Sequence, residues 1–365
     1  MLHHHLPTAE AIETPSSLLR LCPAHAPTPL LDLPGLAAAL GVAAVLTKDE
    51  GCRLLGSFKA LGGVYAGLRA LARAAGLPVV ALLDPSRPYT ALPPLVCASD
   101  GNHGLAVAAA ARLAGAQARV FLPSAISEGR VARILAKGAE VVRVPGTYDD
   151  AVREAAGAAR GGGALLVADT SEDLANPVVA DVMAGYGVIA EEIRAQLTEA
   201  RHATPTHIFV QAGVGGLAAA MADGLRAVLA PPARIVVVEP AAAACVQAGL
   251  AAGRPVAVTG ALETAAEMLS CGEASASALA VLRRQGADAL AVPEAALLTA
   301  PGFLAAHGGP GTTPSGAAGL AGLRAALADS AVAGRLDLGP QSRVLLLITE
   351  ACLPDGHGFQ GEVFP

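Results

Sequence analysis

The chain has 365 residues, of which 53% are hydrophobic and 15% charged, and its net charge is −6 at pH 7. This length exceeds the usual size of one domain, so it predicts two domains or one large α/β unit with ample core. The hydrophobic content excludes a disordered chain, and the lack of a Lys/Arg block argues against a nucleic-acid partner. Arg, Gly or Pro interrupts the apolar stretches before about 18 residues, which argues against a membrane span.

The N-terminus, Met1 to Pro7, has no basic segment followed by an apolar run, so we expect no signal peptide and a cytoplasmic location. Its consecutive histidines, His3 to His5, have no other candidate ligands beside them, so we expect a frayed terminus and no metal site. The cysteines form no C-x-x-C pair, which is typical of reduced, mostly buried thiols in a cytosolic enzyme. They are Cys22, Cys52, Cys97, Cys245, Cys271 and Cys352.

Strands and helices are predicted to alternate along the chain. The predicted strands are 43–46, 95–98, 118–122, 140–142, 164–167, 208–210, 235–238 and 344–348. The predicted helices are 58–74, 102–114, 128–136 and 149–159. Continuous apolar runs such as 235–238 suit strands buried on both faces, and the alternation predicts parallel sheets covered by helices. The stretch 84–94 carries four prolines and is predicted to be a loop.

The first glycine-bearing segment, Gly56-Ser57-Phe58-Lys59, places a single lysine at the start of a predicted helix. Most lysines are solvated at the surface, and this segment alone does not exclude that interpretation. Phe58 and Leu61 indicate a partly buried setting, and burial favours the neutral amine that Schiff-base formation requires.

The second segment, Ser99-Asp100-Gly101-Asn102-His103, follows a predicted strand and opens a helix. The free N–H groups and the dipole of such a helix start can hold an anion, for example a substrate carboxylate, and Asn102 can hydrogen-bond a ring oxygen. An ordinary N-capping turn is the alternative, because Asp and Asn commonly make one.

The third segment, Gln211-Ala212-Gly213-Val214-Gly215-Gly216-Leu217, also lies between a strand and a helix. Glycines let backbone N–H groups close on phosphate oxygens. A dinucleotide site is the alternative, since Glu239 follows the next strand. The spacing is G-x-G-G instead of G-x-G-x-x-G, however, and Lys59 and Asn102 would then have no role.

The order of lysine, asparagine loop and glycine loop resembles the tryptophan-synthase-β-like (fold type II) enzymes that use pyridoxal 5′-phosphate (PLP), over about residues 27–353. The resemblance implies an α/β protein of two parallel-sheet domains with the cofactor in the cleft between them. It assigns 1–49 and 153–365 to a large PLP-binding domain and 50–152 to a small mobile domain. It also implies a homodimer.

Within this family the chain is most similar to the diaminopropionate ammonia-lyases. The similarity lies in segments 48–50, 58–63, 100–104, 169–170, 211–215, 238–240, 271–273, 315–316 and 349–350. Threonine and serine dehydratases of the fold usually carry a small residue where Asp100 stands, and this difference is the main discriminator.

The resemblance also implies a role for each site residue. Lys59 forms the Schiff base and moves the Cα proton, and Asp100 and Asp169 are the other catalytic groups. The implied cofactor contacts are Asn102 to the 3′-oxygen, Gly213, Val214, Gly215 and Gly216 to the phosphate, and Thr349 to the pyridine nitrogen. The implied substrate-binding residues are Ser99, Asp100, Gly101, His103 and Asp169.

The reaction implied is β-elimination of ammonia from 2,3-diaminopropionate, an amino-acid substrate, to give pyruvate and ammonia. Asp100 on the ring face opposite Lys59 would let the enzyme use both enantiomers. A hydroxyl at Thr349 would leave the ring nitrogen unprotonated and favour prompt elimination. For both Asp100 and Asp169, a cap or turn is the structural alternative.

Several alternatives stay open at this point. A serine, threonine or 3-hydroxyaspartate dehydratase or a β-replacement synthase of the same fold would use the same lysine and glycine loop. A PLP-binding protein without turnover is an interpretation from another class, which the intact Lys59 and Asn102 argue against. Cys245 and Cys271 resemble paired positions of the family, so two free thiols or a disulfide are possible outcomes.

Overall fold

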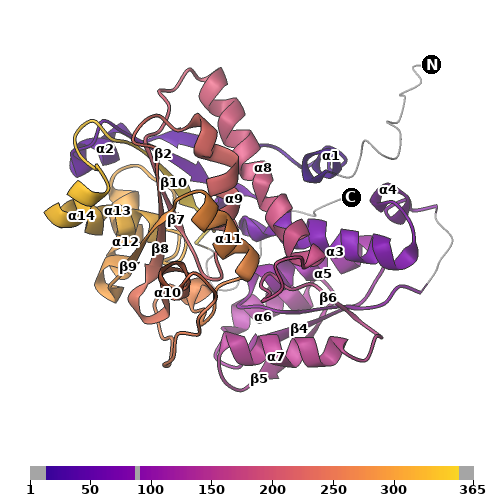
Figure 1. Cartoon of the computed structure of the whole chain (residues 1–365). Helices are drawn as coiled ribbons and strands as arrows, with labels where there is room; N and C mark the ends of the chain where they lie inside the picture. The colour runs from indigo at the N-terminus through magenta and orange to yellow at the C-terminus, as the bar shows by residue number, and fades with distance from the viewer. Residues whose placement is uncertain (1–13, 87–90, 353–365) are drawn as a thin grey trace, which may run out of the picture.

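The computed structural model describes residues 14–86 and 91–352, and two separate sheets organise them (Figure 1). The larger sheet has six strands in the order β1-β2-β10-β7-β8-β9. Their bounds are Leu30–Asp32 (β1), Ala44–Asp49 (β2), Arg343–Ile348 (β10), His207–Gln211 (β7), Arg234–Pro240 (β8) and Asp288–Val292 (β9). All neighbouring strands are parallel except β1, which pairs antiparallel with β2.

The smaller sheet has four parallel strands in the order β5-β4-β3-β6. Their bounds are Glu140–Val144 (β5), Ala118–Pro123 (β4), Leu95–Ala98 (β3) and Leu165–Leu166 (β6). Helices α5 (Asn102–Ala114) and α7 (Tyr148–Ala159) pack against this sheet, and α6 (Glu128–Leu135) packs against α5 and β5.

Helices also cover the larger sheet. Those in contact with it are α2 (Pro34–Leu40), α9 (Gly216–Leu225), α10 (Cys245–Ala252) and α13 (Ala318–Ala328). The outer helices are α11 (Ala276–Arg284), α12 (Glu294–Ala306) and α14 (Ser330–Arg335), and the single 3-10 turns are η2 (Glu50–Cys52), η3 (Leu54–Gly56), η4 (Arg226–Val228), η5 (Ala241–Ala243) and η6 (Glu267–Leu269).

Two helices join the sheet layers. Helix α3 (Lys59–Ala75) packs against α5 of the smaller unit and against α8 (Pro177–Glu199), and α8 in turn packs against α9 of the larger unit. Glycines allow this close approach, because an added Cβ on Gly62 of α3 would lie 2.6 Å from the carbonyl oxygen of Val182 in α8. The short helices α1 (Pro15–Leu19) and α4 (Val79–Leu82) both contact α3, and α1 also contacts α8.

The predicted fold class is confirmed: both sheets are parallel apart from β1, and helices cover them. The predicted strands and helices are all present, with ends that differ by at most three residues. Part of the predicted proline-rich loop, 87–90, and the three N-terminal histidines lie outside the described residues. No helix among the described residues is long and apolar enough to cross a membrane.

The domain division stays a prediction. The four-stranded sheet includes β6 (Leu165–Leu166), which lies beyond the predicted boundary at residue 152. The segment that returns the chain from the smaller to the larger sheet is therefore the stretch from β6 into α8.

Candidate active site

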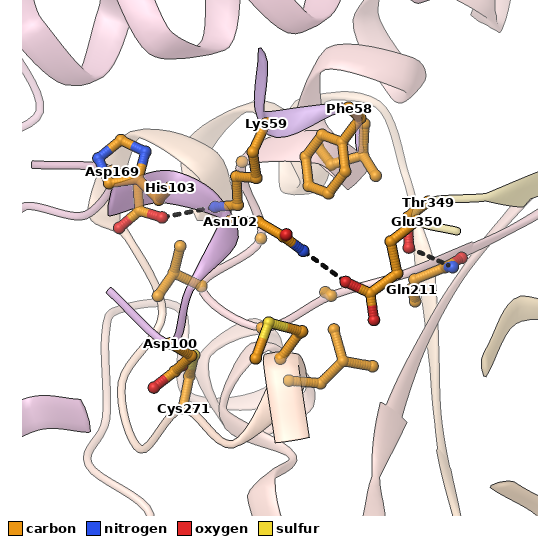
Figure 2. A pocket seen from close by; sticks show the side chains of 18 of the residues that line it. Phe58, Lys59, Asp100, Asn102, His103, Asp169, Gln211, Cys271, Thr349 and Glu350 are labelled. Atoms are coloured by element: carbon orange, nitrogen blue, oxygen red, sulfur yellow. Dashed lines mark hydrogen bonds and ion pairs between the residues drawn. The ribbon is translucent and has the colours of Figure 1, made fainter. Parts of the chain in front are cut away.

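The strands of both sheets end around one pocket, which measures about 750 Å³ when counted out to its open mouth. This placement follows from the topology, because the carboxyl ends of parallel strands meet at one edge and the loops that follow them form a crevice. The lining comes from the start of α3, the loops after β3, β7 and β10, the segment after β6, and residues of α7, α8 and η6. It includes Lys59, Asp100, Asn102, His103, Asp169, Gly213, Gly216, Thr349 and Glu350 (Figure 2).

Lys59 and Asp169 form the central ion pair of the pocket. The Nζ atom of Lys59 donates to Oδ2 of Asp169 at 2.6 Å, and the Tyr148 hydroxyl donates to Oδ1 at 2.7 Å. Burial by itself lowers the pKa of Lys59, as the sequence predicted. The Asp169 carboxylate outweighs burial, however, and raises that pKa above its ordinary value. The expectation of a neutral Lys59 is therefore wrong for the cofactor-free protein.

Asp169 is held in its ionised form by the same contacts. Burial alone would raise its pKa, but the charge of Lys59 and the hydrogen bonds from Lys59 and Tyr148 lower it overall. The side chain is 7% exposed. Asp169 is thus a buried carboxylate committed to two site residues, and the structure does not use it as a cap.

Asp100 stands on the side of the pocket away from Lys59, beside Cys271 (Figure 2). Burial, followed by the nearby Asp169 carboxylate, raises the pKa of Asp100 to about 8. Ser99, rather than Asp100, serves the turn: its Oγ accepts N–H bonds from Gly101 and Gly104, both at 2.8 Å. The carboxyl of Asp100 is therefore not taken up by an N-cap.

His103 and Asn102 begin helix α5 below this turn. His103 is 3% exposed, its Nε2 lies 2.8 Å from the Val167 carbonyl oxygen, and burial lowers its pKa. A neutral imidazole whose Nε2–H donates to Val167 fits these facts. The Nδ2 atom of Asn102 donates to Oε2 of Glu350, which lies two residues beyond the end of β10.

The glycine loop joins β7 to α9. Gly215 has φ of +95°, a conformation that suits glycine, and α9 begins at Gly216. An added Cβ on Gly213 would lie 2.9 Å from the Cys271 sulfur, so the loop has no room for a side chain there. The first N–H groups of α9 therefore reach the pocket with no side chain over them, which suits a phosphate.

Glu239, the acidic residue considered for a dinucleotide site, has another task. Its carboxylate accepts N–H bonds from Val246 at 2.7 Å and Gln247 at 2.8 Å, at the start of α10. It is fully buried, and burial raises its pKa to about 7. Glu239 thus stabilises a helix start and is not placed to hold a ribose.

Thr349 directly follows β10 at the pocket wall. Its side chain is buried, and the amide nitrogen Nε2 of Gln211 donates to its Oγ1 at 3.1 Å. Because that donor occupies the oxygen, the Thr349 hydroxyl proton is directed elsewhere, and an acceptor in the pocket can receive it.

These residues fit pyridoxal phosphate. Lys59 offers a primary amine for covalent attachment, residues 213–216 offer backbone N–H groups at a helix start, and Thr349 offers a hydroxyl. Two parallel α/β units that share such a pocket define a fold type II PLP enzyme. The chain belongs to the pyridoxal-phosphate dependent enzymes, since the model of that family matches residues 21–350. Pyridoxal phosphate is its cofactor.

Known proteins narrow the similarity further. Diaminopropionate ammonia-lyase from Salmonella typhimurium is 35% identical over 349 residues, which are 90% of this chain and 86% of that protein. The structure of Escherichia coli diaminopropionate ammonia-lyase with an aminoacrylate–PLP azomethine reaction intermediate is 30% identical, with a TM-score of 0.82, and covers 94% of this chain and 88% of that one. The threonine deaminase from T.th. is 28% identical, with a TM-score of 0.71, and covers 93% of this chain and 96% of that one.

All residues predicted for the site line the pocket except Gly101, which lies in the turn between β3 and α5. Among the pocket residues to which sequence reasoning assigned no role are the polar side chains of Tyr148, Tyr186, Gln211 and Glu350. Glu350 had a signal, because it adjoins Thr349 in a family-like segment. Tyr186 had none, since it lies in the middle of a long helix.

Proposed function

We propose that this chain eliminates ammonia from 2,3-diaminopropionate and releases pyruvate. Overall, one diaminopropionate and one water give one pyruvate and two ammonia. The observation that carries the proposal is Asp100, a carboxyl group on the pocket wall away from Lys59 and free of capping duty. The similarity to diaminopropionate ammonia-lyases over 90% of the chain supports the same reaction.

The charge of the pocket suits a substrate with two amines. Its lining holds three carboxyl groups, Asp100, Asp169 and Glu350, and one side chain that is cationic at neutral pH, Lys59. The β-amine of diaminopropionate is cationic in water, so an ionised carboxylate attracts it. A β-hydroxyl, as in serine or threonine, gains no such attraction.

Pyridoxal phosphate, when bound, supplies an electron sink that acidifies the Cα hydrogen of the substrate. The side chains then divide the proton transfers. The Nζ atom of Lys59 takes the Cα proton of one enantiomer, and Asp100, in its ionised form, takes that of the other. With a pKa of about 8, Asp100 is ionised in a minor fraction of the protein at pH 7, and that fraction grows as the pH rises. The β-ammonium, held beside a carboxylate, leaves as neutral ammonia without needing a further proton.

The test is a substrate panel with the purified holoenzyme, with pyruvate and 2-oxobutyrate as readouts. Diaminopropionate should give pyruvate, while serine and threonine should react far more slowly. Turnover of serine or threonine without turnover of diaminopropionate would assign a dehydratase instead, which the similarity to threonine deaminase makes the relevant competitor.

A second test concerns the two proton acceptors. Asp100→Asn should reduce turnover of one enantiomer, expected to be D-diaminopropionate, by about 100-fold or more, the usual share of a general base. Turnover of the L enantiomer should fall much less. Equal losses for both enantiomers would refute a second base.

We further propose that the enzyme works in the cytoplasm as a homodimer, without a nucleic-acid or membrane partner. All six cysteines are free thiols in the structure, including Cys245 and Cys271, which suits a reducing compartment. The mass measured by light scattering tests the dimer, and titration of thiols in the denatured, unreduced protein tests the cysteines.

A further inference from the structure

The contact between Asn102 and Glu350 joins the two sheets at the pocket. Asn102 opens α5 beside the smaller sheet, and Glu350 follows β10 of the larger one. The Nδ2 atom of Asn102 donates to Oε2 of Glu350 (Figure 2). Glu350 is 6% exposed, so water competes little for its carboxylate.

The second carboxylate oxygen of Glu350 is fixed as well. Oε1 accepts the hydroxyl proton of Thr313, and the Thr313 oxygen itself accepts the N–H of Gly316 at 3.0 Å. Because Gly316 approaches the hydroxyl as a donor, the single proton of Thr313 is left to point at Glu350. Both carboxylate oxygens thus receive donors from set directions. The Thr312 hydroxyl also donates to the backbone oxygen of Glu350 at 2.6 Å.

This arrangement decides which way the Asn102 amide faces. An ionised carboxylate only accepts hydrogen bonds, so the amide must turn its NH₂ group, and not its oxygen, toward Glu350. One of the two N–H bonds is used there, which leaves the other for an acceptor in the pocket. In enzymes that this chain resembles, the implied acceptor is the 3′-oxygen of the cofactor.

We propose that Glu350 is a positioning residue for the cofactor, which acts by fixing the Asn102 amide with a donor toward the pocket. Thr313 and Gly316 complete the chain of hydrogen bonds that holds the carboxylate. The inference depends on pyridoxal phosphate as the cofactor and is independent of the substrate proposed above.

Replacing Glu350 with glutamine keeps the size of the side chain but replaces one of the two acceptor oxygens with a donor NH₂ group. A glutamine must place its own NH₂ toward either Thr313 or Asn102, and both already act as donors. Titration of the apoprotein with pyridoxal phosphate should therefore show a Kd for Glu350→Gln raised about 10- to 100-fold, the usual loss of one charge-assisted hydrogen bond. The visible absorbance of the bound cofactor should also shift, because its ring oxygen loses a donor.

A control variant and a double-mutant cycle distinguish a positioning role of Glu350 from a general disturbance of the structure. Thr312→Val removes a hydrogen bond to the backbone of Glu350 and should leave the cofactor Kd within about twofold of wild type, the scatter of an uncoupled change. Asn102→Ala should weaken cofactor binding, and adding Glu350→Gln to it should cause little further loss, since Glu350 acts through Asn102.

Three outcomes would overturn the proposal. One is a Glu350→Gln protein with the Kd and spectrum of wild type. Another is a full additional loss when Glu350→Gln is added to Asn102→Ala. The third is a Glu350→Gln apoprotein that does not fold, as judged by circular dichroism, because the carboxylate would then serve the fold. Thr313→Val, which keeps the carboxylate and removes its anchor, should give the same change in spectrum.

Discussion

The Nζ atom of Lys59 lies 2.6 Å from Oδ2 of Asp169, so the lysine that attaches the cofactor is paired with a buried carboxylate before the cofactor arrives. The two residues come from different elements of the fold, the start of α3 and the segment after β6. Tyr148 donates to the other oxygen of Asp169 and sets its direction. The pair keeps Lys59 charged, and attachment of the cofactor must deprotonate it.

Asp169→Asn should make this deprotonation easier. Burial lowers the pKa of Lys59, while the Asp169 carboxylate and, after it, the Tyr186 hydroxyl raise it, so removing the carboxylate should lower that pKa. Below the pKa of Lys59, the neutral fraction grows tenfold for each unit by which the pKa falls. Capture of pyridoxal phosphate by the apoprotein at pH 7 should therefore be at least about tenfold faster in Asp169→Asn, as followed by stopped-flow absorbance.

The pH dependence of cofactor capture should show the direction of the change in the pKa of Lys59. Wild-type capture should still rise with pH above 9, since a raised pKa keeps Lys59 protonated there, whereas capture by Asp169→Asn should level off at lower pH. Tyr148→Phe is the matched control, because it removes a hydrogen bond to Asp169 and leaves the charge. Slower capture by Asp169→Asn at pH 7 would contradict this account.

Lys59→Ala separates covalent attachment from cofactor binding. The glycine loop at residues 213–216 remains, so the apoprotein should still bind pyridoxal phosphate, though more weakly. The absorbance band of the lysine-bound cofactor should be missing, and pyruvate formation should fall by about 1,000-fold or more, since the attaching amine and proton acceptor are lost together. A wild-type band in this variant would mean that another amine holds the cofactor.

Gly213→Ala tests the close packing behind the phosphate loop. The added methyl group would lie 2.9 Å from the Cys271 sulfur, so either the loop or the sulfur must shift. A shift of the loop moves its N–H groups away from the phosphate, and we expect the cofactor Kd to rise about tenfold, which corresponds to 1.4 kcal/mol. Fluorescence titration of the apoprotein measures it.

The matched rescue uses the same contact. Adding Cys271→Ala removes the sulfur that the new methyl group meets, so the double variant should recover most of the lost affinity. If Gly213→Ala and the double variant bind the cofactor equally weakly, the crowding between residue 213 and residue 271 is not the cause.

The lysine, the asparagine and the glycine loop could be predicted to share one pocket because each lies at the end of an element that the sequence defines. Helix α5, for example, runs from Asn102 to Ala114 as predicted. Parallel strands then bring such ends to one edge of a sheet. The site could be outlined from the sequence for this reason.

The partners of these residues depend on long-range pairing that no local pattern carries. Glu350 meets Asn102 only because β10 ends beside the start of α5, and Tyr148 meets Asp169 because α7 starts near the end of β6. A local rule can also fail: Pro301 ordinarily predicts a helix break, yet helix α12 continues through it. The charged state of Lys59 likewise follows from one distance, which composition and spacing do not determine.

A buried cluster away from the pocket provides a test of stability. Glu192 of α8 accepts from Lys48 Nζ at 2.7 Å and from Arg53 at 2.7 and 2.8 Å, and Arg53 also pairs with Glu50. All four side chains are at most 7% exposed. Burial lowers the pKa of Lys48, so this lysine depends on Glu192 for its charge.

Glu192→Gln should lower the free energy of unfolding at pH 7 by about 3–5 kcal/mol, because it leaves buried cations without their carboxylate. Urea denaturation measures the loss. Glu191→Gln is the matched control: Glu191 is the exposed neighbour in the same helix, and its replacement should stay within about 0.5 kcal/mol of wild type.

The pH dependence of the stability difference between wild type and Glu192→Gln tests whether the lost charge is the cause. Burial alone would raise the pKa of Glu192, but Arg53 and Lys48 lower it below 4.5, its ordinary value. A carboxylate with a lowered pKa stabilises the fold above the pKa of the unfolded chain and loses that contribution as the pH falls through the folded value. The difference between wild type and Glu192→Gln should therefore be largest near neutral pH and shrink below pH 4.5. A difference that stays constant from pH 7 to pH 4 and below would mean that lost packing, and not lost charge, destabilises the variant.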